Sequence, residues 1–244
     1  METVRAFILN QWRKQINTMK YNNILKGIFI DRPNRFIANI EIDGKTEAVH
    51  VKNTGRCKEL LIPGTIVYVE KSDNPDRKTE FDLIAVCKGD ELYNIDSQAP
   101  NKVFAEWILN SGYFGNIDIL KPECKYGDSR FDFYIESDNR KIFVEVKGVT
   151  LEEDGVLMFP DAPTERGVKH LKKLCKCVDD GFEAYIVFVI QTEKVKCFTP
   201  NKRTHPEFAE VLKIADGKGV NILALNCNVT EDSLDINTFV PIVL

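Results

Sequence analysis

The 244-residue sequence lacks the cysteine pattern of a secreted disulfide framework. Its seven cysteines are odd in number and form no paired CxxC sets, and only Cys175 and Cys177 lie close together. A CxC pair by itself is weak support for a metal site. We therefore expect reduced, mostly buried thiols in a cytoplasmic protein.

Long apolar segments are missing as well. The first twenty residues have no continuous apolar core of a signal peptide, and no later stretch approaches the roughly 20 apolar residues of a membrane span. The sequence has neither a P-loop nor a GxGxxG motif after a strand, which weakens the case for an enzyme or sensor of a small phosphorylated ligand. The net charge of −4 argues against indiscriminate adhesion to nucleic acid but is compatible with a local basic patch. We expect a protein with no membrane partner.

Residues 1–21 are predicted to form an amphipathic helical extension. Apolar side chains recur there at helical spacing: Val4, Phe7, Ile8, Trp12, Ile16 and Met19. Such a helix would pack on the body of the protein or on a second subunit. The sequence is equally compatible with a natural start at Met19.

Residues 22–96 are predicted to form a small β-barrel. Five segments rich in β-branched and aromatic residues are separated by turn signals such as DG, PG and NP: ILKGIFI, RFIANIEI, KTEAVHV, TIVYVE and EFDLIAV. Five short strands in so short a segment favour an OB-fold, and an SH3-like barrel would have a similar pattern.

Residues 97–244 are predicted to form an α/β domain. Helical segments begin at Asn101, Thr164 and His205, and they alternate with strands that include AYIVFVI and NILAL. Strands that are apolar throughout are covered on both faces, which favours a mixed sheet flanked by helices. The predicted fold class is therefore α/β (α+β) with two domains.

A β-hairpin is predicted within this domain, with residues 137–140 (SDNR) as its loop. Glu136 would then pair with Lys141, and the numbers of every opposed pair would sum to 277. This register places six apolar residues on one side of the hairpin: Phe131, Phe133, Ile135, Ile142, Val144 and Val146. A slip of one residue would turn that apolar set outward.

The other side of the hairpin carries charges, with Asp132 opposite Glu145 and Lys147 two residues farther on. Directly opposed side chains have Cβ atoms about 4.5–5.5 Å apart, and like charges there destabilise a strand pair. A divalent cation between the carboxylates explains the pattern, since Mg²⁺ (or Mn²⁺) prefers one or two carboxylates with water and phosphate oxygens. Lys147 would then assist the nucleophile or stabilise charge that develops on phosphorus. The alternative is a solvated hairpin face with a salt bridge.

An Asp on one strand and Glu-x-Lys on the next resemble the PD-(D/E)xK nucleases, although Phe131 stands where that motif has Pro. Further segments narrow the resemblance: HVKNTGRCKELLIPG, APNKVFAEWI, FVEVKGVTL and FPDAPTERGVKHL. From about residue 22 to its C-terminus, the chain resembles the sugar fermentation stimulation protein family. This resemblance implies an OB-fold joined to a PD-(D/E)xK nuclease-like domain, with a role in DNA binding.

The same resemblance implies a third acid beside the metal. In nucleases of this kind the helix before the hairpin often contributes one, and Glu106 stands on that helix. Glu123, on the strand that leads into the hairpin, is the alternative. We therefore expect Asp132, Glu145 and Glu106 to hold the metal, with Lys147 completing the catalytic set.

Two polar surfaces are candidates for nucleic-acid contacts. On the helix around residues 164–178, one face carries basic side chains and no acid: Arg166, Lys169, His170, Lys172, Lys173 and Lys176. In the barrel, a loop and the turn before it supply Arg32, Arg35, Asn53, Thr54 and Arg56. Phe36 and Tyr68 would suit base stacking, although an aromatic residue on a barrel strand is more often part of the core.

The sequence thus predicts a cytoplasmic DNA-binding protein with a Mg²⁺-dependent phosphodiesterase (nuclease) site. The alternative is a non-catalytic DNA-binding regulator of carbohydrate metabolism genes on a nuclease-derived fold. A homodimer would suit a protein that grips duplex DNA, but no residue establishes one.

Overall fold

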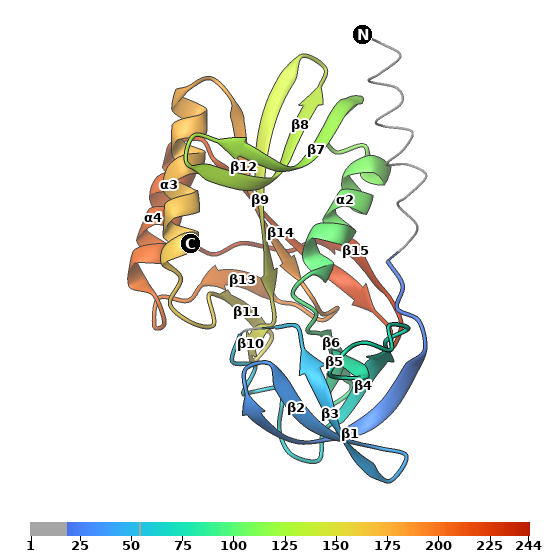
Figure 1. Cartoon of the computed structure of the whole chain (residues 1–244). Coiled ribbons are helices and arrows are strands. Elements are labelled where there is room, and N and C mark those ends of the chain that lie inside the picture. The colour runs from blue at the N-terminus through green and yellow to red at the C-terminus, as the bar shows by residue number, and fades with distance from the viewer. Residues whose placement is uncertain (1–18, 54) are drawn as a thin grey trace.

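A computed structural model describes residues 19–53 and 55–244. Residues 1–18 of the helical extension predicted over residues 1–21 lie outside the described residues, as does the loop residue Thr54. Residues 19–21 are described and are not helical, and Lys20 forms a β-bridge with Ser233. The chain forms a β-barrel followed by a mixed sheet with helices on both of its faces (Figure 1). The predicted two-domain fold class is therefore confirmed. No helix of the described part is long and apolar enough to cross a membrane.

The first domain is a five-stranded barrel, as predicted for an OB-fold. Its strands follow one another as β1 (Ile24–Asn34), β2 (Ile37–Ile42), β3 (Lys45–Val51), β4 (Ile66–Lys71) and β5 (Phe81–Lys88). The sheet order is β3-β2-β1-β4-β5, and a parallel pairing of β3 with β5 closes it. A short strand, β6 (Glu91–Asn94), extends the sheet beside β5. The alternating apolar residues of these strands point inward and form a separate core.

The second domain is built on a six-stranded sheet with the order β15-β14-β12-β9-β8-β7. Its strands are β7 (Ile117–Tyr126), β8 (Ser129–Ser137), β9 (Arg140–Val149), β12 (Glu183–Ile190), β14 (Asn221–Val229) and β15 (Leu234–Phe239). The central strand β12 runs parallel to both of its neighbours, and the outer pairings are antiparallel. A smaller sheet joins β10 (Leu151–Glu153), β11 (Val156–Phe159) and β13 (Cys197–Pro200).

Helices cover both faces of the large sheet, and this explains the fully apolar sequence of β12. Helix α2 (Ala99–Ser111) packs on one face, and α3 (Glu165–Asp179) and α4 (Pro206–Gly217) pack on the other (Figure 1). Gly112, with φ of 68°, ends α2 in the left-handed conformation that glycine adopts without strain. The hydroxyl of Thr164 accepts a hydrogen bond from the backbone N–H of Gly167 (3.1 Å) and caps α3.

The register predicted for the hairpin is confirmed from Glu136–Lys141 to Phe133–Val144. Only Asp138 and Asn139, both with positive φ, form the turn, so the strands continue one residue farther than predicted. Phe131 differs from the prediction. The ladder between the strands ends at Phe133, and Phe131 packs with Phe143 in the core beneath α3 and α4. Where the strands separate, the Asp132 carboxylate accepts a hydrogen bond from the backbone N–H of Val146 on β9.

The two domains share a packed interface. Ile84 and Ala85 of the barrel belong to the core beneath α2. The Tyr68 hydroxyl donates a hydrogen bond to Glu231 (2.6 Å), and this contact lies across the domain boundary. Tyr68 therefore packs against the second domain, which agrees with the favoured interpretation of a barrel-strand aromatic as part of a core and not with a role in base stacking.

Candidate active site at the split between strands β8 and β9

Asp132 lies where β8 and β9 separate. Its Oδ2 accepts a hydrogen bond from the backbone N–H of Val146 (2.7 Å), and its Oδ1 accepts one from the Asn101 side chain (2.9 Å). One bond comes from β9 and the other from the first turn of α2. Asp132 is therefore held in place from two elements, although it is not a ladder partner of Glu145 as predicted.

Glu145 lies on the neighbouring strand and faces α3, with only 2% of its surface exposed. Its Oε1 accepts hydrogen bonds from the Lys147 ammonium group and from Nδ1 of His170. Its Oε2 is buried and has no hydrogen-bond partner. An unsatisfied buried acceptor costs about 1–3 kcal/mol, and more when it is charged. The position therefore suits a bound cation.

The two carboxyl groups have pKa values that shift in opposite directions. Burial and the nearby charge of Glu145 raise the pKa of Asp132. Burial also acts to raise the pKa of Glu145, but the hydrogen bonds and charges of His170 and Lys147 outweigh it and lower that pKa. Glu145 therefore carries a firmly held negative charge, and a cation would stabilise the ionised form of Asp132.

His170 does not lie on the basic surface where the sequence analysis placed it. The side chain is buried at 5% exposure, and its ring meets the edge of Phe131 at a centroid distance of 6.1 Å. The bond to Glu145 satisfies Nδ1 of the imidazole, which offsets part of the cost of burying the ring. His170 therefore belongs to the carboxylate site, and the helical pattern alone did not reveal its partner.

The remaining basic side chains of α3 are partly neutralised. Asp128, in the turn between β7 and β8, pairs with both Lys169 (3.0 Å) and Lys173. Farther along the helix, Lys172 pairs with Glu207 and Lys176 with Asp180. The basic face of α3 carries no acid of its own, but acids that lie outside the helix pair with these four lysines. Arg166 is exposed, and no ion pair or hydrogen bond joins it to any described side chain.

Glu106 is not brought to this site. Burial raises its pKa, and its neighbours are the backbone of Met19 and the side chains of Asp235 and Lys102. The reason is helical geometry. Glu106 and Asn101 are five residues apart, which is about 140° around the helix axis, and Asn101 is the residue that faces Asp132. Sequence reasoning overlooked Asn101, although it stands in the segment APNKVFAEWI.

In the barrel, Arg32 holds a loop together. Its guanidinium donates four hydrogen bonds of 2.7–3.0 Å to backbone carbonyls of Arg35, Asn53, Gly55 and Arg56. These donors are therefore not free for phosphate, contrary to the prediction. Arg35 lies over the exposed ring of Phe36, 4.6 Å from its centroid, so this pair is still a candidate for contacts with bases.

The same loop touches the second domain. The backbone N–H of Arg56 donates a hydrogen bond to Asp161 (2.8 Å), and Asn53 Oδ1 accepts one from the backbone N–H of Gly55 (2.7 Å). A Cβ atom at Gly55 would lie 2.5 Å from Asp161 Oδ2, so a larger residue there would displace the Asp161 carboxylate from this contact. Asp161 was not recognised in the sequence, because nothing local links it to residues about a hundred positions earlier.

A divalent cation fits the donor atoms at the split between the strands. Asp132 and Glu145 supply carboxylate oxygens, one of them buried without a partner, and Mg²⁺ binds through one or two carboxylates while keeping several waters. Within residues 19–53 and 55–244, no three His, Cys, Asp or Glu side chains already converge as a complete metal site. Cys175 and Cys177 are free and buried, as expected for structural thiols.

Models of known protein families match both domains of the chain. The model of the sugar fermentation stimulation protein RE domain matches residues 98–233, and that of the SfsA N-terminal OB domain matches residues 30–95. The chain belongs to the sugar fermentation stimulation protein family. It is 59% identical to a homologue from Clostridium beijerinckii over 93% of this chain and 100% of that protein. It is 61% identical to one from Ruminiclostridium cellulolyticum over 92% and 99% of the two chains.

A solved structure of this family has the same fold. It is described as Pyrococcus furiosus SfsA in complex with Ca²⁺ and is 31% identical, with a TM-score of 0.82 over 93% of this chain and 100% of that one. The second domain of the present chain is accordingly a restriction endonuclease-like (RE) domain of the SfsA family.

Proposed function

We propose that this SfsA-family chain binds DNA and that its RE domain is a Mg²⁺-dependent phosphodiesterase. One observation carries the proposal. Glu145 is buried, its Oε1 is tied to two donors, and its Oε2 has no partner beside a second carboxylate, Asp132. Two carboxylates buried together without a cation would destabilise the fold, because each loses its hydration and the two repel each other. The Ca²⁺ in the Pyrococcus furiosus relative supports a divalent cation.

Each side chain has a defined task in this proposal. Asp132 and Glu145 would hold the cation, which supplies Lewis-acid polarisation of a phosphodiester. Asn101 and the backbone of Val146 orient Asp132, and His170 orients Glu145. Lys147 is only 17% exposed, so its charge is weakly screened and would stabilise the negative charge that develops on phosphorus.

The test compares wild type with Asp132→Asn and Glu145→Gln on labelled single-stranded, double-stranded and branched DNA. Cleavage is measured with Mg²⁺, with Mn²⁺ and with chelator. Asp118→Asn, an exposed acid on strand β7, is the matched control. We expect cleavage that requires metal, is lost in both site variants and persists in the control. Cleavage that survives in either site variant would contradict the proposal.

A non-catalytic DNA-binding regulator is the second candidate. One observation favours it: the ammonium group of Lys147 is already engaged with Glu145, which leaves a neutralised cluster. The same experiment separates the two functions. Salt-sensitive DNA binding without cleavage under any metal would identify the regulator.

A further inference from the structure

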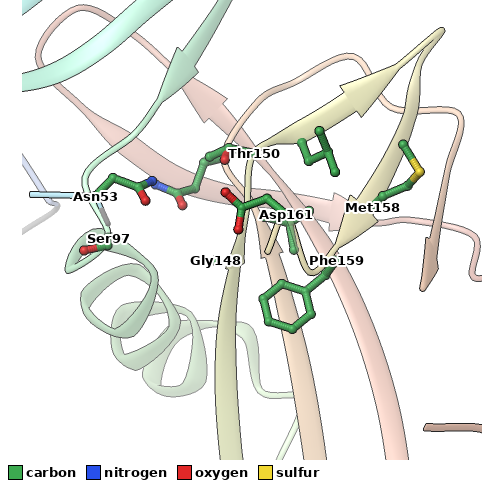
Figure 2. Close-up of a pocket in the computed structure, with 10 residues that line it drawn as sticks. Asn53, Ser97, Gly148, Thr150, Met158, Phe159 and Asp161 are labelled. Atoms are coloured by element: carbon green, nitrogen blue, oxygen red, sulfur yellow. The ribbon is translucent and has the colours of Figure 1, made fainter. Parts of the chain in front are cut away.

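A pocket of about 100 Å³ lies at the junction of the two domains. Figure 2 shows Asn53 and Ser97 on one side of it and Met158 and Phe159 on the other, with the Asp161 carboxylate between them. Its remaining lining residues are Gly148, Val149, Thr150, Leu151 and Gln191. The inner pocket, as we call it, is therefore walled by the barrel loop, the start of α2 and the end of β9.

A wider pocket of about 330 Å³ adjoins it and shares Leu151 and Asp161 with it. This outer pocket carries three cations from both domains: Arg56, Lys58 and Arg203. Acids line it too, but the ion pair between Arg203 and Glu153 joins side chains that are 68% and 51% exposed. An exposed pair of this kind contributes little, so Arg203 is available to another anion.

The inner pocket directly follows the candidate active site. Gly148 and Val149 come immediately after Lys147 on β9, where each residue adds about 3.3 Å. A Cβ at residue 148 would lie 2.7 Å from Gln191 Oε1 and 2.8 Å from Pro100, so these two side chains cover one side of the Gly148 backbone. Gly148 is nevertheless exposed and lines the pocket, so a ligand there would lie one residue along β9 from Lys147.

Polar atoms without partners face the inner pocket. The side-chain amide of the buried residue Gln191 donates to Asn94 (2.9 Å) and Asp96 (3.0 Å), which turns its Oε1 toward Gly148. Among the described residues, nothing donates a hydrogen bond to this Oε1 or to Oδ1 of Asp161. The Nδ2 of Asn53 is likewise without an acceptor in the described part of the chain. Two acceptors and one donor therefore converge there, a combination that matches the hydrogen-bonding edge of a nucleobase.

We propose that one unpaired nucleotide of a DNA strand is seated between the two domains. Its base enters the inner pocket, and its phosphate lies in the outer pocket against Arg56, Lys58 and Arg203. A base in a duplex is stacked and its pairing edge is occupied, so only a single-stranded or frayed region can be bound in this way. This inference rests on the proposed DNA-processing function and names the form of its substrate.

The first test blocks the inner pocket. Ser97 is exposed at the pocket wall, and its hydroxyl donates to the Lys52 carbonyl (2.7 Å). Ser97→Phe would fill the pocket, and Ser97→Ala removes the same hydrogen bond without filling it. Binding of labelled single-stranded and duplex oligonucleotides is measured by fluorescence anisotropy in Ca²⁺. We expect Ser97→Phe to weaken single-strand binding about tenfold or more, with Ser97→Ala close to wild type.

The second test concerns the phosphate. Arg203→Ala should weaken single-strand binding several-fold and reduce its salt dependence. Lys218→Ala, which removes an exposed cation paired with Asp179, is the matched control and should leave binding unchanged. Ca²⁺ affinity, measured by calorimetry, should be the same in all four variants.

The outcomes separate this inference from the proposed function. If Ser97→Phe is folded and binds Ca²⁺ but keeps wild-type affinity for single strands, the nucleotide does not occupy the pocket. A wild-type preference for fully paired duplex would also overturn the inference. If wild type binds no DNA of any form, the proposed function fails together with it.

Discussion

His170 and Lys147 contact the same oxygen of Glu145, and the other oxygen of that carboxylate is left buried and without a partner. The three side chains come from two elements, strand β9 and helix α3. This asymmetry gives the carboxylate a defined orientation, with one edge held by the protein and one edge free for a cation.

His170 is expected to act by orientation. His170→Ala removes a donor from a buried carboxylate and should lower Ca²⁺ affinity about ten- to a hundredfold, with a loss of about 2 kcal/mol in the free energy of unfolding. His170→Asn keeps an N–H at nearly the same position and should restore much of the affinity. Calorimetric titration and urea unfolding measure both effects. Equal Ca²⁺ affinity in wild type and His170→Ala would rule out the orienting role.

Asn101 is expected to support Ca²⁺ binding by orienting Asp132, whereas Glu106 is not expected to affect Ca²⁺ binding. Asn101→Ala removes one of the two described hydrogen bonds to Asp132 and is expected to weaken Ca²⁺ binding about tenfold. Glu106→Gln changes an acid whose contacts lie toward Met19 and Asp235, so Ca²⁺ affinity should stay at the wild-type value. The same calorimetric titration compares the two. A loss of Ca²⁺ affinity in Glu106→Gln would show instead that Glu106 contributes to the metal site.

Arg32 should behave as a structural clamp. Arg32→Lys keeps the positive charge but cannot bond four carbonyls at once, so the free energy of unfolding should fall by about 2–3 kcal/mol. Arg35→Lys, which alters an exposed cation over Phe36, serves as the control and should leave stability nearly unchanged. Denaturant unfolding gives both values. An Arg32→Lys variant of wild-type stability with weaker DNA binding would mean that Arg32 contacts phosphate.

Acid should destabilise the barrel through Asp82. Burial acts to raise its pKa, but hydrogen bonds from Arg77 and His50 and the charge of Lys52 lower that pKa to about 2. The folded-state pKa lies below the ordinary value of 3.8. The stabilisation is therefore present above pH 4, where it amounts to about 2 kcal/mol, and it is lost as the pH falls toward 2.

Urea unfolding at pH 6 and pH 3 tests this expectation against Asp82→Asn, which does not titrate. Wild type should lose about 1 kcal/mol more than the variant between the two values of pH. Equal losses in both proteins would show that Asp82 is not held ionised by its partners.

Much of the fold was readable from local sequence patterns. Alternation with a period of two, together with the turn at Asp138–Asn139, determined the register of the β8–β9 hairpin, because a slip would have exposed its apolar side. The strand segments of the barrel and the apolar strand β12 followed from the same kind of pattern. Asp132 and Glu145 were identified because like charges on paired strands destabilise a hairpin unless a cation lies between them.

Only the tertiary structure decided which distant side chains meet these acids. The bond from His170 to Glu145 spans 25 residues, and that from Asn101 to Asp132 spans 31. Helical periodicity shows that a residue lies on a face but not what that face packs against. Glu106 was therefore selected on the family resemblance while Asn101 was overlooked, and His170 was placed among surface lysines. The loop held by Arg32 and the pocket beside Asp161 likewise exist only where the two domains are packed together.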